Sequence, residues 1–430
     1  MTIDAYQLSQ RFLSNNTIKI FDKNLHWYNG KYYEKISDEQ LKHTVYNFLT
    51  EDEKKQVKCN DIKQVIYHIK MQPSIESLEY PANEQYICCQ NGVVDVYNMK
   101  LLPHSPEYNC TYMINARYTQ TPTNNGVYNN FMQSLFAVDE NLFEINENEN
   151  IQSLEEWLGY FISDCTRAKK MAIIYGKPNT GKSVLLALVE YLLGKSNVSN
   201  VNIKQVNDEF YLAHLCENRA NICYDTKNIK LNDIGNIKQL TSPDDSITVR
   251  KPHCTPYSTK RKTKIMFACN TLPELDLNSD ERKAYFVRVM LFHFNNIISK
   301  KDQNPNLIYE LISEKDYIFS RLLTAYNKFL QREYKFLISN DMKLTRKQYQ
   351  DRYEIVKKFV KKHIKKKTKA KISCKDLTNE LEKFVQSHGL HYEPKYKTEL
   401  FKILKDNDIE HKKVKIKGKS IMGFYGAKLK

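Results

Sequence analysis

Residues 176–183 read GKPNTGKS, and this motif constrains the fold more than any other part of the chain. An apolar run, MAIIY, precedes the motif, and a second apolar run, VLLALV, follows it. A strand, a glycine-rich loop and a helix in this order form the context that a G-x-x-x-x-G-K-S loop requires. The pattern therefore predicts a strand that ends at Tyr175 and a helix that begins near Lys182.

The spacing of this motif suits a phosphate. Glycines let successive backbone N–H groups face an anion, and the helix N-terminus adds positive potential. Lys182 can then reach the β- and γ-phosphates, while the Ser183 hydroxyl can hold Mg²⁺. A glycine-rich turn without a ligand is the alternative, but strand, loop and helix all agree with nucleotide binding. We expect ATP and Mg²⁺ to be bound here by nine residues: Gly176, Lys177, Pro178, Asn179, Thr180, Gly181, Lys182, Ser183 and Val184.

The net charge of +16 is concentrated at one end of the chain. Residues 343–430 hold 26 Lys and Arg and 10 Asp and Glu, whereas the preceding 342 residues hold 40 of each kind. A concentrated basic segment usually meets a polyanion, because each neutralised phosphate releases counterions. A disordered lysine tail is the alternative for residues 357–371 taken alone.

The rest of the basic segment has the periodicity of a folded domain. Apolar residues recur at helical spacing around residues 355–363, 377–385 and 396–406, and residues 411–425 alternate with period two around Gly418. Three helices and a basic hairpin predict a winged-helix domain, with the third helix in a DNA groove and the hairpin on phosphates. A protein-docking module is the less favoured alternative at this charge.

Three further apolar runs end or begin at polar residues that suit an ATPase. The run RANICYD ends at Asp225, which suits coordination of Mg²⁺ through water or activation of the attacking water. The run KIMFACN ends at Asn270, which suits a sensor of the γ-phosphate, and RVMLFHF begins at Arg288, which suits a phosphate across a subunit boundary. The alternatives are a helix cap, an ordinary turn residue and a structural salt bridge.

The order of these motifs resembles the superfamily III helicases of the phage and plasmid primase–helicase family. The resemblance rests on GKPNTGKS, on the segments IKQLTSPDDSITVRK and ACNTLPEL, and on RVMLFHF. The lead-in EEWLGYFISDCTRAKK and the N-terminal segment QNGVVDVYNMKLLPHSP are also similar to that family. The C-terminal segment is similar to the winged helix of its members, including replication initiators of staphylococcal pathogenicity islands. The similarity covers nearly the whole chain and is strongest from residue 154 to residue 294.

The resemblance implies an α/β fold: an AAA+-type core with a parallel sheet (residues 119–342), after a mixed α+β domain (1–118) and before a winged helix (343–430). It also implies a homohexamer that threads DNA through its centre and unwinds it from 3′ to 5′. Lys182, Asp225, Asn270 and Arg288 match the family's catalytic positions, with Ser183 and Asp225 near the metal. Five residues match its DNA-binding pore segment or lie close to it: Arg250, Lys251, His253, Lys260 and Arg261.

One departure from the family pattern concerns the strand acid. Many members have two adjacent acids there, whereas Tyr224 precedes Asp225 in this chain, so a metal role and a water role for Asp225 both stay open. The primase half of the family is missing, and we expect no primer synthesis.

We therefore expect a DNA helicase that initiates replication of a mobile element or phage. Its expected partners are single- and double-stranded DNA, including a replication origin, and host replication proteins. A helicase loader or DNA-remodelling ATPase that does not unwind is the second class, and a small-molecule kinase is the third. The absence of long apolar stretches and of a signal-peptide pattern predicts a cytoplasmic protein without a membrane partner. The ten scattered cysteines have no zinc spacing and are expected to be reduced thiols.

Overall fold

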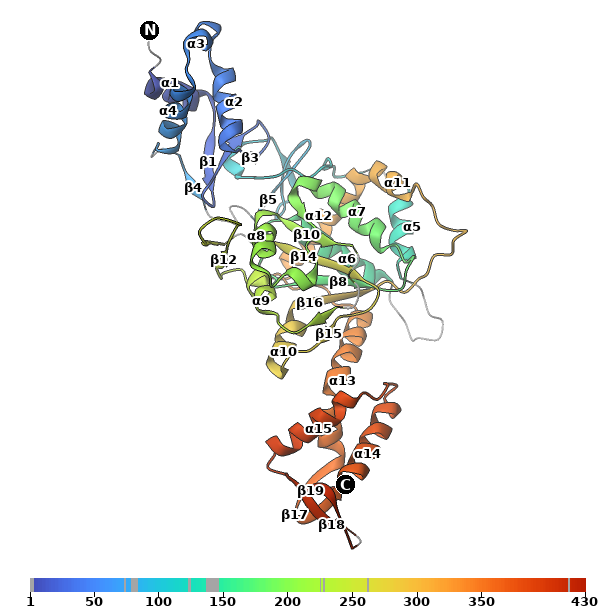
Figure 1. Cartoon of the computed structure of the whole chain (residues 1–430). Coiled ribbons are helices and arrows are strands. Elements are labelled where there is room, and N and C mark those ends of the chain that lie inside the picture. Colours follow the sequence, from blue (N-terminus) through green and yellow to red (C-terminus); the bar gives the residue numbers. More distant parts are fainter. Residues whose placement is uncertain are drawn as a thin grey trace. The chain divides into compact units, whose positions relative to one another are not determined.

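The computed structural model describes residues 4–72, 75–78, 84–122, 125–136, 147–224, 226, 229–260, 263–416 and 418–430. The chain divides into two compact units, residues 1–342 and residues 343–430 (Figure 1). Each unit has its own apolar core. Helix α13 (Asn340–His363) begins in the first unit and continues into the second.

The first unit opens with a small α+β segment. A four-stranded sheet of order β3-β2-β1-β4 shares an apolar core with three of the segment's four helices. The helices start where their caps predict, since Asp4, Ser37 and Thr50 accept hydrogen bonds from backbone N–H groups of the first turns. The elements are α1 (Ala5–Asn15), β1 (Ile18–Phe21), β2 (Asn24–Tyr28), β3 (Tyr33–Lys35), α2 (Asp38–Phe48), α3 (Glu51–Gln56), α4 (Cys59–Lys70) and β4 (Ser77–Leu78).

A second antiparallel sheet follows and joins the main core. It consists of β5 (Tyr86–Cys89), β6 (Gly92–Asp95) and β7 (Lys100–Leu102). Gly92 closes the β5–β6 turn, and any side chain there would lie 2.3 Å from the Leu102 carbonyl oxygen. Ile87 and Val94 belong to the same buried cluster as the helices around the main sheet, so residues 86–118 pack on the core.

The main sheet has five parallel strands in the order β16-β8-β14-β10-β9. Its central strands are apolar without alternation because both faces are buried: Ala172 and Ile174 face one cluster, and Ile173 between them is equally buried. The predicted α/β fold with a parallel sheet is therefore confirmed. The strands are β8 (Met171–Tyr175), β9 (Val198–Ser199), β10 (Ala220–Cys223), β14 (Lys264–Cys269) and β16 (Val289–His293).

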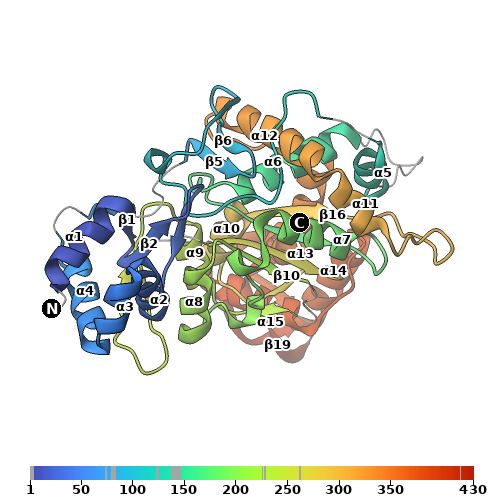
Figure 2. The same cartoon turned by 90° about the horizontal axis from the view of Figure 1, so that it is seen from above.

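Two long helices, α6 (Glu147–Ile162) and α12 (Lys315–Gln331), lie side by side against this core (Figure 2). Gly159 permits their close approach, since a Cβ atom there would lie 2.4 Å from the Leu322 carbonyl oxygen. The other helices of the core are α5 (Val127–Ser134), α7 (Lys182–Leu193), α8 (Glu209–Glu217), α9 (Gly235–Thr241), α10 (Ser279–Arg288) and α11 (Leu307–Ser313). Two-stranded ladders join β11 (Lys230–Leu231) to β15 (Glu274–Leu275) and β12 (Ile247–Val249) to β13 (Tyr257–Thr259).

The second unit combines helices with a three-stranded antiparallel sheet of order β17-β19-β18. After α13 come β17 (Ile364–Ser373), α14 (Cys374–Ser387), α15 (Pro394–Asp406), β18 (Glu410–Ile416) and β19 (Lys419–Leu429). The helices and the hairpin at Gly418 lie where the periodicity predicts them. Strand β17 was not predicted, because its lysines interrupt any apolar alternation and only its two ends are buried.

Two expectations about the environment of the chain can be compared with the structure. All ten cysteines lie in the described ranges, and none of them forms a disulfide bond there. Among the helices in the described ranges, none is long and apolar enough to cross a bilayer.

Candidate nucleotide-binding site

The loop between β8 and α7, residues 176–181, is called the glycine loop below. Its glycines are required by shape. A Cβ atom at Gly176 would lie 2.0 Å from the Phe294 carbonyl oxygen, and one at Gly181 would lie 2.7 Å from Leu135 Cδ2. Gly181 also has a φ of +83°, which side chains rarely tolerate. The strand ends at Tyr175 and the helix begins at Lys182, as predicted.

Lys182 folds back over the glycine loop. Its Nζ donates to the carbonyl oxygens of Gly176 (2.6 Å) and Lys177 (2.7 Å) and to Thr180 Oγ1 (3.2 Å), and the residue is only 8% exposed. A buried ammonium group needs such acceptors. These acceptors are uncharged, so a phosphate oxygen would be a stronger partner for the same group. Ser183 is exposed in the first turn of α7.

A cavity of about 1340 Å³ opens at the glycine loop. Residues 178–184 line one side of it, as do Tyr224 and Asn270 at the carboxyl ends of β10 and β14. The crevice outside the carboxyl ends of parallel strands is where open α/β sheets bind ligands. Seven of the nine residues predicted to bind the nucleotide, residues 178–184, thus line the same cavity as Asn270, whereas Gly176 and Lys177 do not.

The other wall of the cavity was not predicted from the sequence. It is formed by α5 and by residues 296–310. Asn296 Nδ2 donates to the Ser134 carbonyl oxygen (2.9 Å), and the Ile298 N–H donates to the Asn179 carbonyl oxygen (2.8 Å). These bonds join segments far apart in sequence, and no local pattern marks them.

Asp225 lies outside the described residues. Its neighbour Tyr224 lines the cavity and donates a hydrogen bond from its hydroxyl to the Glu190 carboxylate of α7. Burial, followed by this carboxylate, raises the pKa of Tyr224, so the phenol stays protonated at neutral pH. The tyrosine in place of a strand acid therefore connects β10 to the helix that follows the glycine loop.

Arg288 lies away from the glycine loop of its own chain. It ends α10, where its Nε donates to Thr241 Oγ1 (3.1 Å) and its Nη1 to the Ala284 carbonyl oxygen (3.1 Å). The next residue, Val289, pairs in register with Met171 at the start of β8. Because β16 and β8 are parallel, Arg288 lies at the amino edge of the sheet, whereas the glycine loop follows the carboxyl edge.

The predicted DNA-binding residues gather at the β12–β13 hairpin. Arg250 and Lys251 form ion pairs with acids of α8: Arg250 Nη1 is 3.9 Å from Glu209 Oε1, and Lys251 contacts Glu217. The hydrogen bond that the Lys251 ammonium donates to the Glu217 carboxylate raises the pKa of Lys251. His253 is exposed at a φ of +60°.

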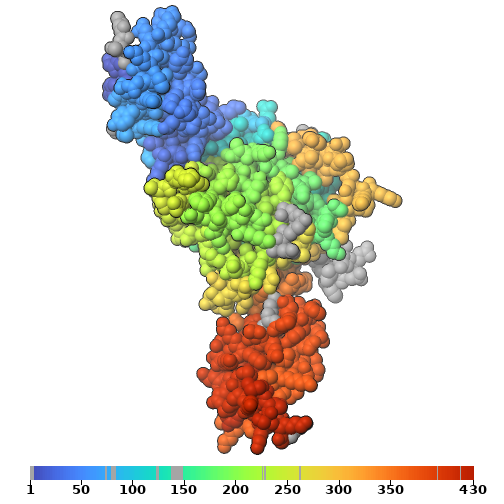
Figure 3. All heavy atoms as spheres, in the orientation of Figure 1, coloured from blue at the N-terminus to red at the C-terminus, as the bar shows by residue number. Residues whose placement is uncertain are grey.

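The same hairpin contacts the N-terminal segment. Thr259 Oγ1 donates to the Asp22 carboxylate, and Lys35 Nζ lies 3.8 Å from Glu217 Oε1. Figure 3 shows the residues near position 250 directly beside the N-terminal residues. Lys260 follows β13 and is exposed, while Arg261 lies outside the described residues.

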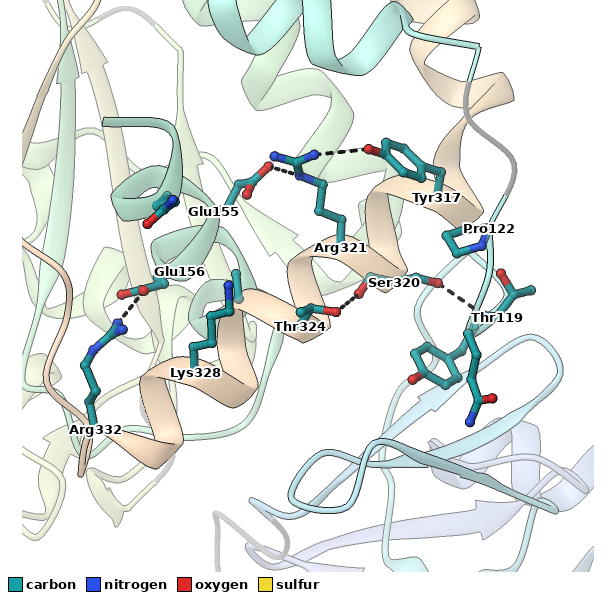
Figure 4. Close-up of a pocket in the computed structure, with 14 residues that line it drawn as sticks. Thr119, Pro122, Glu155, Glu156, Tyr317, Ser320, Arg321, Thr324, Lys328 and Arg332 are labelled. Atoms are coloured by element: carbon teal, nitrogen blue, oxygen red, sulfur yellow. Dashed lines mark hydrogen bonds and ion pairs between the residues drawn. The ribbon is translucent and has the colours of Figure 1, made fainter. Parts of the chain in front are cut away.

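A second cavity, of about 390 Å³, lies between α6, α12 and residues 118–122. Arg321 of α12 and Arg332, the residue that follows this helix, turn toward two buried carboxylates of α6, Glu155 and Glu156 (Figure 4). Arg321 Nε lies 2.5 Å from Glu155 Oε1. Burial raises the pKa of Glu155, and Arg321 partly offsets this effect. None of the predicted site residues lines this cavity, and its ion pairs connect the two helices.

Two family models match parts of the chain, and solved structures share its fold. Residues 5–159 match the family model described as D5 N terminal like, and residues 174–283 match a family of unknown function, DUF5906. No curated protein matches the chain.

Among solved structures, the chain is similar to the A form apo structure of the NrS-1 C terminal region, with 12% identity and a TM-score of 0.54. The alignment covers 99% of this chain and 100% of that one. An A form apo structure of NrS-1 residues 305–718 (12% identity, 98% and 99% covered) has a TM-score of 0.53, and a further apo structure of this region (12%, 99% and 100%) has 0.51. The chain therefore shares the fold of that region over nearly its whole length.

Proposed function

We propose that this chain is an ATP-dependent DNA helicase that initiates replication of a phage or another mobile element, acting as a homohexamer that unwinds DNA from 3′ to 5′. The cavity at the glycine loop carries the proposal. It combines a phosphate-binding motif, a buried lysine ammonium and a volume sufficient for a nucleotide. The match of residues 5–159 and the fold of the NrS-1 C terminal region support the resemblance to phage primase–helicases.

In this proposal the glycine loop holds the ATP phosphates through backbone N–H groups. Lys182 moves its ammonium from loop carbonyls to the β- and γ-phosphates, and Ser183 and Asp225 hold Mg²⁺, which neutralises developing charge. Asn270 directly follows β14, the neighbour of β8, and lies on the cavity wall. Its amide is therefore suitably placed to orient the attacking water or to sense the γ-phosphate.

The position of Arg288 supports the proposal that several copies of this chain assemble into a ring. An arginine at the amino edge of the sheet cannot serve a phosphate at the carboxyl edge of the same sheet. The remaining way for it to stabilise charge on the γ-phosphate is to act on the nucleotide of a neighbouring subunit. A closed ring of identical subunits supplies one such contact to every site.

The β12–β13 hairpin is the proposed contact with single-stranded DNA. Arg250, Lys251 and His253 lie at its tip, and Lys260 and Arg261 continue the basic segment. Glu209 and Glu217 hold two of these cations within the subunit. DNA phosphates offer the same cations equivalent charged acceptors, so binding would exchange one set of ion pairs for another.

The second unit is the proposed contact with duplex DNA at an origin. Its order of helix, strand, two helices and hairpin suits a winged helix. In such a domain α15 would enter the major groove, and the β18–β19 hairpin would contact phosphates. The net charge of +16 on residues 343–430 supports a polyanionic partner.

Strand displacement tests the proposal. The full chain is incubated with ATP and Mg²⁺ on partial duplexes that carry a single-stranded tail at either the 3′ or the 5′ end. The variant Lys182→Ala is measured in parallel. We expect displacement only with the 3′ tail, only with ATP, and not by the variant. ATP hydrolysis that DNA stimulates without any displacement would contradict unwinding and would indicate a helicase loader or remodelling ATPase. Absence of nucleotide binding would overturn the whole assignment.

A further inference from the structure

The cavity wall formed by α5 and residues 296–310 has the composition of a nucleobase site. Val127, Ile297 and Leu307 give it apolar surface. Ile297 is 50% exposed. It lines the same cavity as the polar residues of the glycine loop. Covering an exposed isoleucine with an apolar group is favourable, because apolar surface is removed from water. A nucleobase has two apolar faces and polar edges, so it can cover this surface and still be read by a polar side chain.

Helix α5 forms part of this wall and also packs against the glycine loop. Phe131 and Leu135 lie against Gly181, where a Cβ atom would be 3.2 Å from Phe131 Cε2 and 2.7 Å from Leu135 Cδ2. Asn130 instead lies toward the N-terminal end of the helix, with its Nδ2 4.0 Å from the corresponding position at Gly126. A nucleotide with its phosphates on the glycine loop can therefore extend along α5 toward Asn130.

Asn130 is also the side-chain amide on this wall whose two N–H donors and carbonyl oxygen are all available to a ligand. The other side-chain amides there donate within the protein: Asn296 to the Ser134 carbonyl (2.9 Å), Asn304 to Glu310 (2.9 Å) and Gln303 to the Ile298 carbonyl (3.4 Å). Asn130 is exposed, lines the cavity, and has no hydrogen bond from its side chain to any part of the chain that the structure describes.

We propose that Asn130 reads the base of the bound nucleotide and selects adenine. An amide can accept a hydrogen bond from the adenine 6-amino group and donate one to N7. Guanine presents two acceptors, O6 and N7, at the same edge. The amide oxygen of Asn130 would then face O6 with no hydrogen atom between the two acceptors. The inference rests on the proposed nucleotide site and names its specificity.

Equilibrium binding measured with fluorescent ATP, with competition by unlabelled nucleotides, tests this role. The wild-type chain should bind ATP about 5- to 100-fold more tightly than GTP, the range expected of one good bidentate contact. Asn130→Ala should bring this ratio to within about threefold of unity, mainly by weakening ATP. The matched control is Gln133→Ala, an exposed amide on the same helix that does not line the cavity. It should leave the ratio unchanged.

A nucleotide that lacks the 6-amino group, purine riboside triphosphate, completes a double-mutant cycle. Removing the amino group should weaken binding to the wild-type chain but not to Asn130→Ala. Equal losses in both proteins, or an ATP:GTP ratio that Asn130→Ala leaves unchanged, would overturn the role of Asn130. The proposed function is tested separately: if Lys182→Ala and the wild type bind ATP equally, the glycine loop is not the nucleotide site.

Discussion

At the scale of single residues, Lys182 is the most informative side chain. Its ammonium is buried and held by three oxygen atoms of the glycine loop. Lys182→Ala removes the charge that would stabilise the transferred phosphate, so we expect ATP turnover to fall by at least about 10²-fold. Phosphate release under saturating ATP measures the effect. Lys195→Ala, an exposed lysine just beyond the other end of α7, serves as the control and should keep wild-type turnover.

Arg288 gives a second prediction at this scale. Arg288→Ala should lower turnover by about 10³ to 10⁵, as expected of an arginine that acts across a subunit boundary. Mixing this variant with Lys182→Ala should restore part of the activity, because one intact site can form between the two kinds of subunit. Arg288→Ala also loses bonds to Thr241 and Ala284, so its melting temperature is measured in parallel. No rescue in confirmed mixed assemblies would indicate a role within one subunit.

Some residues of the candidate site could be predicted from their neighbours in the sequence, whereas others reach the site only through tertiary packing. The glycine loop was predictable because it lies in a motif of eight consecutive residues, 176–183, that is typical of phosphate binding. The apolar runs on both sides predict the strand and the helix that flank the loop. Asn270 was predictable because it directly follows a buried strand. Asn130 was not, since it reaches the cavity only through the packing of α5 on Gly181, which joins residues about fifty positions apart.

At the scale of elements, the same distinction explains β17. The buried strands β8, β14 and β16 were predicted, because they are apolar except for Lys264 at the start of β14 and His293 at the end of β16. Strand β17 has five lysines and is exposed over most of its length. It is a strand because its backbone pairs with β19, and tertiary pairing of this kind can override side-chain pattern.

The lysines of β17 predict a nonspecific contact with DNA. Lys365 stands opposite Lys428, and like charges in this position destabilise a sheet unless a polyanion neutralises them. Lys365, Lys367 and Lys369 are exposed, and within the described residues they form no ion pair. Edge strand β17 therefore suits phosphates rather than base edges.

Replacing Lys365 and Lys367 with glutamine should reduce the salt dependence of duplex binding. Each lost phosphate contact lowers the slope of log K against log salt by about 0.9, so a decrease of about 2 is expected. The ratio of affinities for origin and scrambled duplexes should not change. Glutamines at Lys375 and Lys383 of α14, the second of which pairs with Glu380, form the control. Loss of sequence preference, or loss of binding to anionic vesicles with an unchanged DNA slope, would contradict this role.

At the scale of the whole molecule, charge and chemistry lie in different units. The first unit, residues 1–342, holds the glycine loop and has 40 basic and 40 acidic residues. The second holds the entire net charge of +16 and a core of its own. Separate cores mean that each unit buries its own apolar surface, so either can retain its structure without the other.

Truncation after Met342 should therefore separate origin binding from unwinding. The shortened chain keeps the cavity, Arg288 and the β12–β13 hairpin, and loses every phosphate contact that we propose for residues 343–430. Filter binding at physiological salt should show that affinity for origin duplex collapses, because most of the counterion release disappears with this charge. Hydrolysis of ATP should persist, and a substrate with a free 3′ tail should still be partly unwound, since loading there needs no origin. Origin affinity that survives truncation would place recognition in the first unit. Loss of hydrolysis in a truncated chain that still melts cooperatively would mean that the second unit contributes to the nucleotide site.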